Sequence, residues 1–99
     1  MFTRLMFIRI SPQKAQHRSG FIVQVGSRYS VQYMPGDLTA EVSADFAAVT
    51  GIYPETLTLS RTDGCSMTPT AEDRKMIIKR IKNGLEFLGM RCELCEGHS

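Results

Sequence analysis

Apolar and polar residues alternate along much of the N-terminal half of the chain, which is the pattern of β-strands with one buried face. Residues 6–11 alternate in this way, with Ile8 and Ile10 on one face, and we expect a strand there. The polar stretch that follows, residues 13–20, has no apolar period and predicts a loop or the end of a hairpin.

A hairpin is expected next, because two alternating segments flank Gly26-Ser27. A glycine that leads a two-residue loop suits a type II′ turn, whose twist matches that of the flanking strands. Pro35-Gly36 then has the residues of a type II turn, and alternation resumes up to residue 44. Residues 20–44 are therefore predicted to form a three-stranded meander.

Residues 45–51 are ambiguous between a short helical turn and a continued strand, and we expect Gly51 to end the segment in either case. Residues 55–60 alternate strictly, which predicts another strand with Leu57 and Leu59 facing inward. The turn signals after it indicate that the strand closes there.

One amphipathic helix is predicted over residues 69–88. Thr68 is suited to the N-cap, and Pro69 to the first helical position, where its missing N–H is harmless. Gly89 is suited to a left-handed C-terminal cap. The helix has an apolar stripe at helical spacing, formed by Ile77, Ile78, Ile81, Leu85 and Leu88.

The opposite face of this helix is mostly basic, with Arg74, Lys75, Lys79 and Lys82. Such a face is usually solvated, so we interpret the helix as a structural brace behind the sheet. Residues 90–95 alternate again and predict a short last strand. The pattern as a whole predicts an α+β fold, a single domain over residues 1–99 with a mostly antiparallel, twisted sheet packed by the C-terminal helix.

Composition supports one globular domain and excludes some partners. The chain has 99 residues, of which 42% are hydrophobic and 22% charged, close to the globular average. Its formal net charge is only +2, without a basic stripe, so we expect no nucleic-acid partner. No apolar run approaches the roughly 20 residues of a membrane span, and no signal peptide is recognisable, so a cytoplasmic location without a membrane partner is expected.

The cysteines offer one alternative chemistry. Cys92 and Cys95 form a C-x-x-C, and Cys65 and His98 could complete a zinc site, or the thiols could serve redox chemistry. The strand pattern, however, directs Cys92 and Cys95 to opposite faces, which favours incidental thiols and no metal. A small zinc- or redox-linked module stays open as the alternative.

Catalysis has little support in the sequence. The two histidines, His17 and His98, fall in a polar loop and in the tail, and neither is expected to be held rigidly. No motif of a hydrolase, a nucleotide-binding loop or a metalloprotease occurs. We therefore expect no enzyme activity and no cofactor.

Recognition of another protein is the remaining class of function. Tyrosine and arginine are enriched in interface hot spots, and several fall at or near the expected turns. The candidate partner-binding residues are Arg28, Tyr29, Tyr33, Tyr53, Arg61 and Asp63. Tyr29 and Tyr33 share a strand face with Val31, so a core role is the alternative for both.

A family resemblance suggests the partner. The chain carries Ile52-Tyr53-Pro54-Glu55-Thr56-Leu57, then Leu59, a turn, Met67-Thr68-Pro69, and a helix with Ile77-Ile78, Ile81, Gly84-Leu85 and Gly89. In order, spacing and hydrophobic pattern, most of residues 7–94 resembles small α+β immunity proteins of bacterial polymorphic toxin systems.

The resemblance implies a bacterial immunity protein, an antitoxin in the cytoplasm of the producing cell. It would bind the C-terminal toxin domain of an Rhs-type or type VI secretion effector and occlude its active site. The toxin could be an ADP-ribosyltransferase or another toxin that acts in the cytosol. A plain oligomerising domain, a homodimer joined through a sheet edge, is a further alternative.

Overall fold

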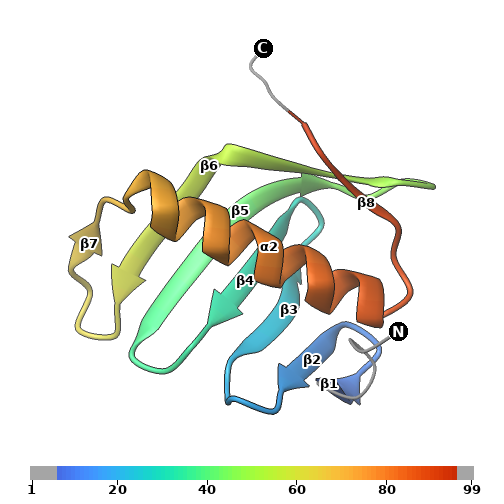
Figure 1. The fold of residues 1–99 in the computed structure, drawn as a ribbon, viewed down its shortest axis with the longest axis horizontal. Coiled ribbons are helices and arrows are strands. Elements are labelled where there is room, and N and C mark those ends of the chain that lie inside the picture. The colour runs from blue at the N-terminus through green and yellow to red at the C-terminus, as the bar shows by residue number, and fades with distance from the viewer. Residues whose placement is uncertain (1–6, 96–99) are drawn as a thin grey trace.

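A single curved sheet, covered on one face by one helix, makes up the part of the chain described by the computed structural model, residues 7–95 (Figure 1). The strands follow chain order across the sheet, each antiparallel to the one before. They are β1 (Phe7–Ser11), β2 (Lys14–His17), β3 (Ile22–Ser27), β4 (Ser30–Met34), β5 (Leu38–Asp45), β6 (Thr50–Arg61) and β7 (Ser66–Met67).

The helix and the last strand complete the fold. Helix α2 (Ala71–Phe87) crosses the sheet diagonally, and β8 (Cys92–Leu94) returns to pair with the start of β6 in parallel (Figure 1). The predicted α+β fold, with a mostly antiparallel meander, one C-terminal helix and a short last strand, is confirmed. Within residues 7–95, no helix has the length and hydropathy to span a bilayer.

Residues 13–20 were predicted as a loop or the end of a hairpin; the loop is wrong, because β2 lies within them and forms a hairpin with β1 on one side and with β3 on the other. Its inward face consists of Ala15, which is fully buried, and of His17, whose ring packs against Phe7 and Phe21. The inward positions of β2 are thus occupied by an alanine and a histidine instead of the large apolar residues that mark most strands. The strand therefore had no recognisable apolar period.

The β3–β4 hairpin is confirmed, but its predicted turn is wrong. Gly26 and Ser27 both belong to β3, and the turn is formed by Arg28 and Tyr29. The pairing register slips between Val25 and Ser27, so a β-bulge absorbs the glycine. A Cβ on Gly26 would lie only 3.1 Å from side-chain carbons of Gln32, which explains why a glycine suits this position.

Residues 45–51 form neither a helical turn nor an unbroken strand. β5 ends at Asp45, the chain bends, and β6 begins at Thr50, so Gly51 lies inside a strand instead of ending one. A Cβ on Gly51 would lie 2.8 Å from the Cys95 sulfur, so glycine makes room for the chain at the end of β8. β6 is consequently much longer than the predicted segment of residues 55–60.

Helix α2 starts two positions later than predicted, because a better cap is available. The N-cap is Thr70 instead of Thr68: its Oγ1 accepts from the Asp73 amide at 3.0 Å, and its own amide donates to Asp73 Oδ2 at 3.4 Å. This reciprocal capping box satisfies two groups that a helix start leaves without partners.

The C-terminal end of the helix follows the prediction. Gly89 has a φ of 97° and donates its amide to the Glu86 carbonyl at 3.0 Å. The Met90 amide donates to the Leu85 carbonyl at 3.0 Å, which completes a Schellman motif.

The core lies between α2 and the sheet. The predicted apolar stripe of the helix is buried, and so are Leu57 and Leu59 of β6. Gly84 allows the closest approach, because a Cβ there would lie 2.7 Å from the Cβ of Val23 on β3. The helix is thus fitted to the sheet at one glycine, while the far face of the sheet has no covering element among residues 7–95 (Figure 1).

Candidate functional site

The predicted contact residues lie at two ends of the sheet. Arg28 and Tyr29 form the β3–β4 turn, and Tyr53 belongs to the same end, since Ser30 pairs with Ser43 and Ser43 with Tyr53. Arg61 pairs instead with Leu38 at the far end of β6, up to about 26 Å from Tyr53 at about 3.3 Å per residue.

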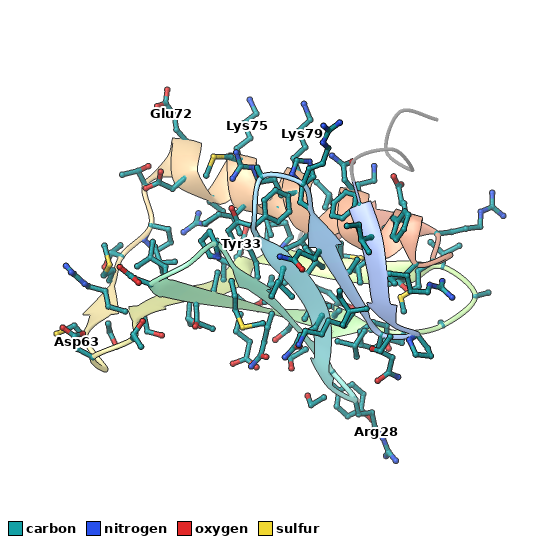
Figure 2. The ribbon with its side chains drawn as sticks, turned by 90° about the horizontal axis from the view of Figure 1, so that it is seen from below. Arg28, Tyr33, Asp63, Glu72, Lys75 and Lys79 are labelled. Carbon is teal, nitrogen blue, oxygen red and sulfur yellow. The ribbon has the colours of Figure 1, made fainter. Side chains whose placement is uncertain are left out.

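Figure 2 shows the same separation for Arg28 and Asp63, which project from different parts of the molecule. The predicted residues therefore do not form one surface.

Tyr33 does not belong to a contact surface. Its side chain is only 1% exposed, and its hydroxyl accepts a hydrogen bond from Arg80 Nη1 at 2.7 Å. The proposed partner-binding role of Tyr33 is thus contradicted, and its alternative as a core aromatic is confirmed.

The turn of Arg28 and Tyr29, called here the β3–β4 tip, combines exposure with a fixed backbone. Tyr29 is 61% exposed, yet its carbonyl accepts from the Ala44 amide at 2.8 Å. The hydroxyls of Ser27 and Ser30 are 2.8 Å apart across the base of the turn, and the Tyr29 amide donates to Ser27 Oγ at 3.4 Å. The tip is a projecting element held from both strands and from β5.

A hollow lies on each side of this tip. One, of about 350 Å³, is rich in hydroxyl groups and is lined by Ser27, Tyr29, Ser30, Glu41, Val42, Ser43, Thr56 and Thr58. The other, of about 470 Å³, is lined by Gln13, Val25, Gly26, Ser27, Arg28, Phe46 and Met90. The tip therefore offers both protruding side chains and adjacent concave surface.

At the other end, Asp63 has a local structural role. Its Oδ1 accepts from the Cys65 amide at 3.0 Å, and Thr62 donates to the Asp37 carbonyl from both its amide and its hydroxyl. Arg61 is exposed beside a shallow hollow lined with Leu38 and Met67. Asp63 is explained by the turn that it stabilises, whereas Arg61 is an exposed cation on the surface.

The cysteines do not assemble the four-ligand site considered from the sequence. Cys65 is exposed in the β6–β7 turn, while Cys92 and Cys95 lie beside the opposite end of β6. His98 lies outside the described residues. Among residues 7–95, no group of three or more His, Cys, Asp or Glu side chains could hold a metal ion.

Electrostatics also keeps Cys92 in the thiol form. Burial, followed by the nearby charge of Glu86, raises the pKa of Cys92 to about 11, so it is neutral at pH 7. The neighbouring Cys95 raises the pKa of Tyr53, with desolvation and Asp45 adding to the effect. The raised pKa values mean that neither Cys92 nor Tyr53 is activated as a nucleophile near neutral pH.

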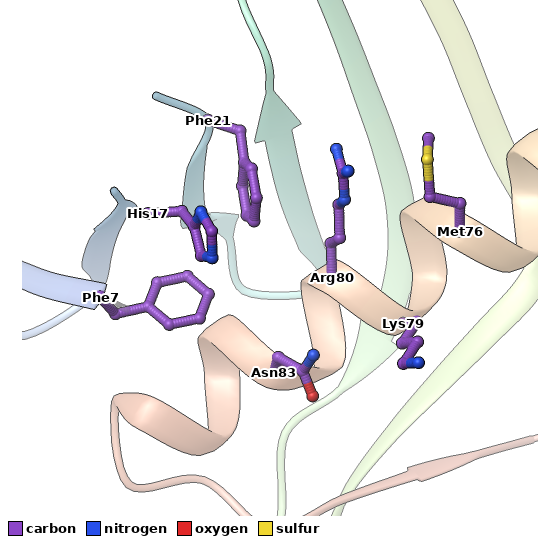
Figure 3. Close-up of a pocket in the computed structure, with 7 residues that line it drawn as sticks. All are labelled: Phe7, His17, Phe21, Met76, Lys79, Arg80 and Asn83. Atoms are coloured by element: carbon purple, nitrogen blue, oxygen red, sulfur yellow. The ribbon is translucent and has the colours of Figure 1, made fainter. Parts of the chain in front are cut away.

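Two hollows flank α2, and the sequence analysis located neither of them. The first, called here the aromatic pocket, has a volume of about 350 Å³ and is lined by Phe7, His17, Phe21, Met76, Lys79, Arg80 and Asn83 (Figure 3). The His17 ring stacks on Phe21 at 4.4 Å between centroids and meets Phe7 edge-on at 5.0 Å. The Arg80 guanidinium lies 5.0 Å from the centre of the Phe21 ring.

His17 is neutral in this pocket near pH 7. Burial lowers its pKa from the ordinary value of 6.5, and the charges of Arg80 and Arg18 lower it further. The Ser19 amide donates to His17 Nδ1 at 3.0 Å, so the proton of the neutral ring resides on Nε2. A histidine expected in a flexible loop is in fact a packed part of the structure.

The second hollow, called here the β6-edge groove, lies on the other flank of α2. It has a volume of about 460 Å³ and is lined by Pro54, Ala71, Arg74, Lys75, Ile78, Lys79, Lys82 and Leu94. The basic helix face was the only signal of it in the sequence. Part of its lining comes from Pro54 of β6 and Leu94 of β8. The periodicity of the helix cannot predict where these strands lie relative to it.

No family model matches the chain, and no curated protein or solved structure is significantly similar to it. The likeness to immunity proteins therefore stays an expectation that rests on the residues that carry it.

Proposed function

We propose that this chain is an immunity protein that binds a cognate antibacterial toxin domain and neutralises it by occluding its active site. The observation that carries the proposal is the β3–β4 tip, where an exposed arginine and an exposed tyrosine form a braced turn. These two residue types are enriched among the residues that dominate binding energy at protein interfaces.

The tip is suited to occupy a cleft. Because its backbone is held by Ser27, Ser30 and Ala44, little conformational entropy remains to be lost when a partner binds. The hollows on its two sides can accept side chains of the partner. The molecule measures 33 × 31 × 24 Å, and its broad face exceeds the roughly 800 Å² that each partner buries in a standard interface.

In this mechanism the chain blocks access and performs no turnover. The Arg28 guanidinium would enter a cleft that normally holds a carboxylate or a phosphate, as in an ADP-ribosyltransferase, and Tyr29 would pack beside it. Inhibition of this kind fits a protein of the producing cell's cytoplasm that meets the toxin domain of an Rhs-type effector there.

Co-expression tests the proposal. An immunity gene is expected beside a gene whose product ends in a toxin domain, and the chain should rescue growth when that domain is expressed in the cytosol. The double variant Arg28→Glu/Tyr29→Ala should lose the rescue, because it reverses the charge and removes the aromatic anchor. Arg18→Glu, in the exposed β2–β3 turn at the opposite end of β3, is the matched control and should keep it.

Two results would contradict the assignment. One is a neighbouring gene set without any toxin-like domain. The other is rescue that survives in Arg28→Glu/Tyr29→Ala, or that is lost equally in Arg18→Glu.

A homodimer through the β1 edge is a second candidate, favoured by one observation. β1 is an outer strand of the described sheet, and its Ile8 and Ile10 are 61% and 50% exposed. Exposed edge strands with apolar side chains can pair with another copy. Light scattering of the purified chain tests this, and Ile8→Lys should abolish any dimer that forms by this route.

A further inference from the structure

The β6-edge groove has an apolar floor. Ile78 of α2 is almost fully buried at its base, Pro54 of β6 forms one wall, and Leu94 of β8 is 51% exposed beside it. A volume of about 460 Å³ has room for one or two large side chains. The groove can therefore take an apolar anchor.

The rim of the groove carries charge of one sign. Arg74, Lys75, Lys79 and Lys82 all line it, and none of its lining residues has a carboxylate. These cations extend over about 12 Å of helix, at about 1.5 Å per residue. Figure 2 shows Lys75 and Lys79 pointing away from the sheet, with Glu72 at the start of the same ridge.

Arg74 is the cation that the fold leaves incomplete. Its Nε is fully buried and has no hydrogen-bond partner among the described residues. A buried donor without an acceptor costs about 1–3 kcal/mol. With Nε enclosed, a carboxylate in the groove would meet the guanidinium through its Nη groups instead.

We propose that the β6-edge groove binds a short acidic segment of a partner protein, with an apolar side chain on the groove floor and carboxylates on Arg74 and the lysines. The cations are spread along the helix instead of converging on one point, which suits several carboxylates along a chain better than a single anionic headgroup. Protein–protein interfaces commonly combine an apolar centre, which is buried, with a polar or charged rim, which gives specificity.

The segment is held through side chains and does not extend the sheet. On this edge β6 pairs with β8 at residues 50–52 and with β7 at residues 59–60, and Pro54 between them has no N–H to offer. The register of β5 against β6 also shifts between Glu41 and Ser43, so β6 bulges there.

This surface is separate from the β3–β4 tip, since Arg28 projects from the opposite side of the molecule to Lys75 and Lys79 (Figure 2). The assignment requires a protein partner but not neutralisation of a toxin. Its test is therefore independent of the growth assay.

The probe is a set of synthetic peptides in which glutamates flank a central Leu, Phe or Tyr. Titration followed by amide NMR should shift the signals of Ile78 and Leu94 for at least one member, and affinity should fall with added salt. The variant Arg74→Gln/Lys82→Gln should weaken this binding about tenfold or more, since charge-assisted hydrogen bonds are lost. Arg18→Gln, which changes an exposed cation in the distant β2–β3 turn, should bind unchanged.

Four outcomes would overturn the proposal. The first is the absence of any glutamate-dependent shift up to about 1 mM peptide, the weakest binding worth assigning. The second is equal binding of peptides with glutamine in place of glutamate. The third is Arg74-dependent binding to anionic phosphatidylglycerol vesicles but to none of the peptides, which would assign the groove to lipid. The fourth is peptide binding only after deletion of residues 96–99, which would make the chain's own end the occupant.

Discussion

Each flank of α2 carries an arginine, and the two arginines differ in the contacts that they make within the fold. On the side of β2 and β3, Arg80 donates to the Tyr33 hydroxyl at 2.7 Å and lies over the Phe21 ring, so its charge is integrated into the packing. On the side of β6, the Nε of Arg74 is buried and has no hydrogen-bond partner within residues 7–95, in a groove lined otherwise by lysines and apolar groups. The arginine on one flank of the helix is thus hydrogen-bonded within the fold (the closed flank), whereas the arginine on the other flank has a donor without an acceptor among the described residues (the open flank).

This difference distinguishes structural charge from charge available for binding. An arginine whose donors are satisfied within the fold contributes to stability, and its replacement should be felt in unfolding. An arginine left without acceptors contributes little to stability and is free to meet an external anion. Replacing Arg80 should therefore affect stability, and replacing Arg74 should affect binding.

The largest effect is expected where the closed flank touches the sheet. Gly84→Ala places a Cβ 2.7 Å from Val23 Cβ, so helix and strand must move apart. Overpacking of this kind costs about 1–3 kcal/mol, and we expect the upper part of that range. Urea unfolding measures it, with Lys79→Ala on the solvent ridge as the control, which should change stability by less than about 0.5 kcal/mol.

Arg80→Met should lower stability by about 1–2 kcal/mol, because the buried Tyr33 hydroxyl loses its donor. The double variant Arg80→Met/Tyr33→Phe removes both partners and should recover part of the loss. Additive losses from the two single changes in such a double-mutant cycle would show that the Arg80–Tyr33 contact contributes nothing.

A smaller, pH-dependent effect is expected from His17. Its pKa is lowered in the folded state, so its contribution to stability is complete above pH 6.5. As the pH falls below that value, the unfolded chain binds a proton that the folded chain resists, and stability is lost down to the folded pKa.

Unfolding should be compared at about pH 7.5 and about pH 5.5, on either side of the ordinary histidine pKa. His17→Phe should lose less stability across this interval than the natural chain. His98→Gln keeps His17 and should lose as much as the natural chain does. Identical pH profiles for His17→Phe and the natural chain would refute the role of His17.

The smallest effect on stability is expected on the open flank. Arg74→Met removes a buried Nε–H that has no acceptor among the described residues, so the free energy of unfolding should not fall and should rise by at most about 1 kcal/mol, the lower end of the cost of such a donor. A loss comparable with that of Arg80→Met would mean that Arg74 is a structural residue after all.

Much of the fold could be predicted from the sequence, because it depends on local patterns. The apolar stripe of α2, the Gly89 cap and the inward Leu57 and Leu59 all follow from period and capping chemistry. β2 could not be predicted, since one histidine and one alanine form its buried face. The β3–β4 turn was misplaced because a bulge, instead of the turn, uses Gly26.

The candidate sites were predictable only in part. Arg28 and Tyr29 were identified as turn residues, and they lie at an exposed tip. Tyr33 was not distinguished from Tyr29 because the misplaced turn put both in one strand, whereas Tyr29 lies in the turn and Tyr33 on the buried face of β4. The groove at Arg74 was missed for another reason: a helical period shows that a face is basic, but it does not show which flank of the helix another strand approaches.

The most direct test measures stability and peptide affinity together in Arg80→Met and Arg74→Met, by urea unfolding and by calorimetric titration with the acidic peptide that binds best. Arg80→Met should lose stability and keep its affinity under conditions where it is fully folded. Arg74→Met should keep its stability and lose affinity about tenfold. Loss of both properties in each variant, or the reverse assignment, would contradict the division of α2 into a structural flank and a binding flank.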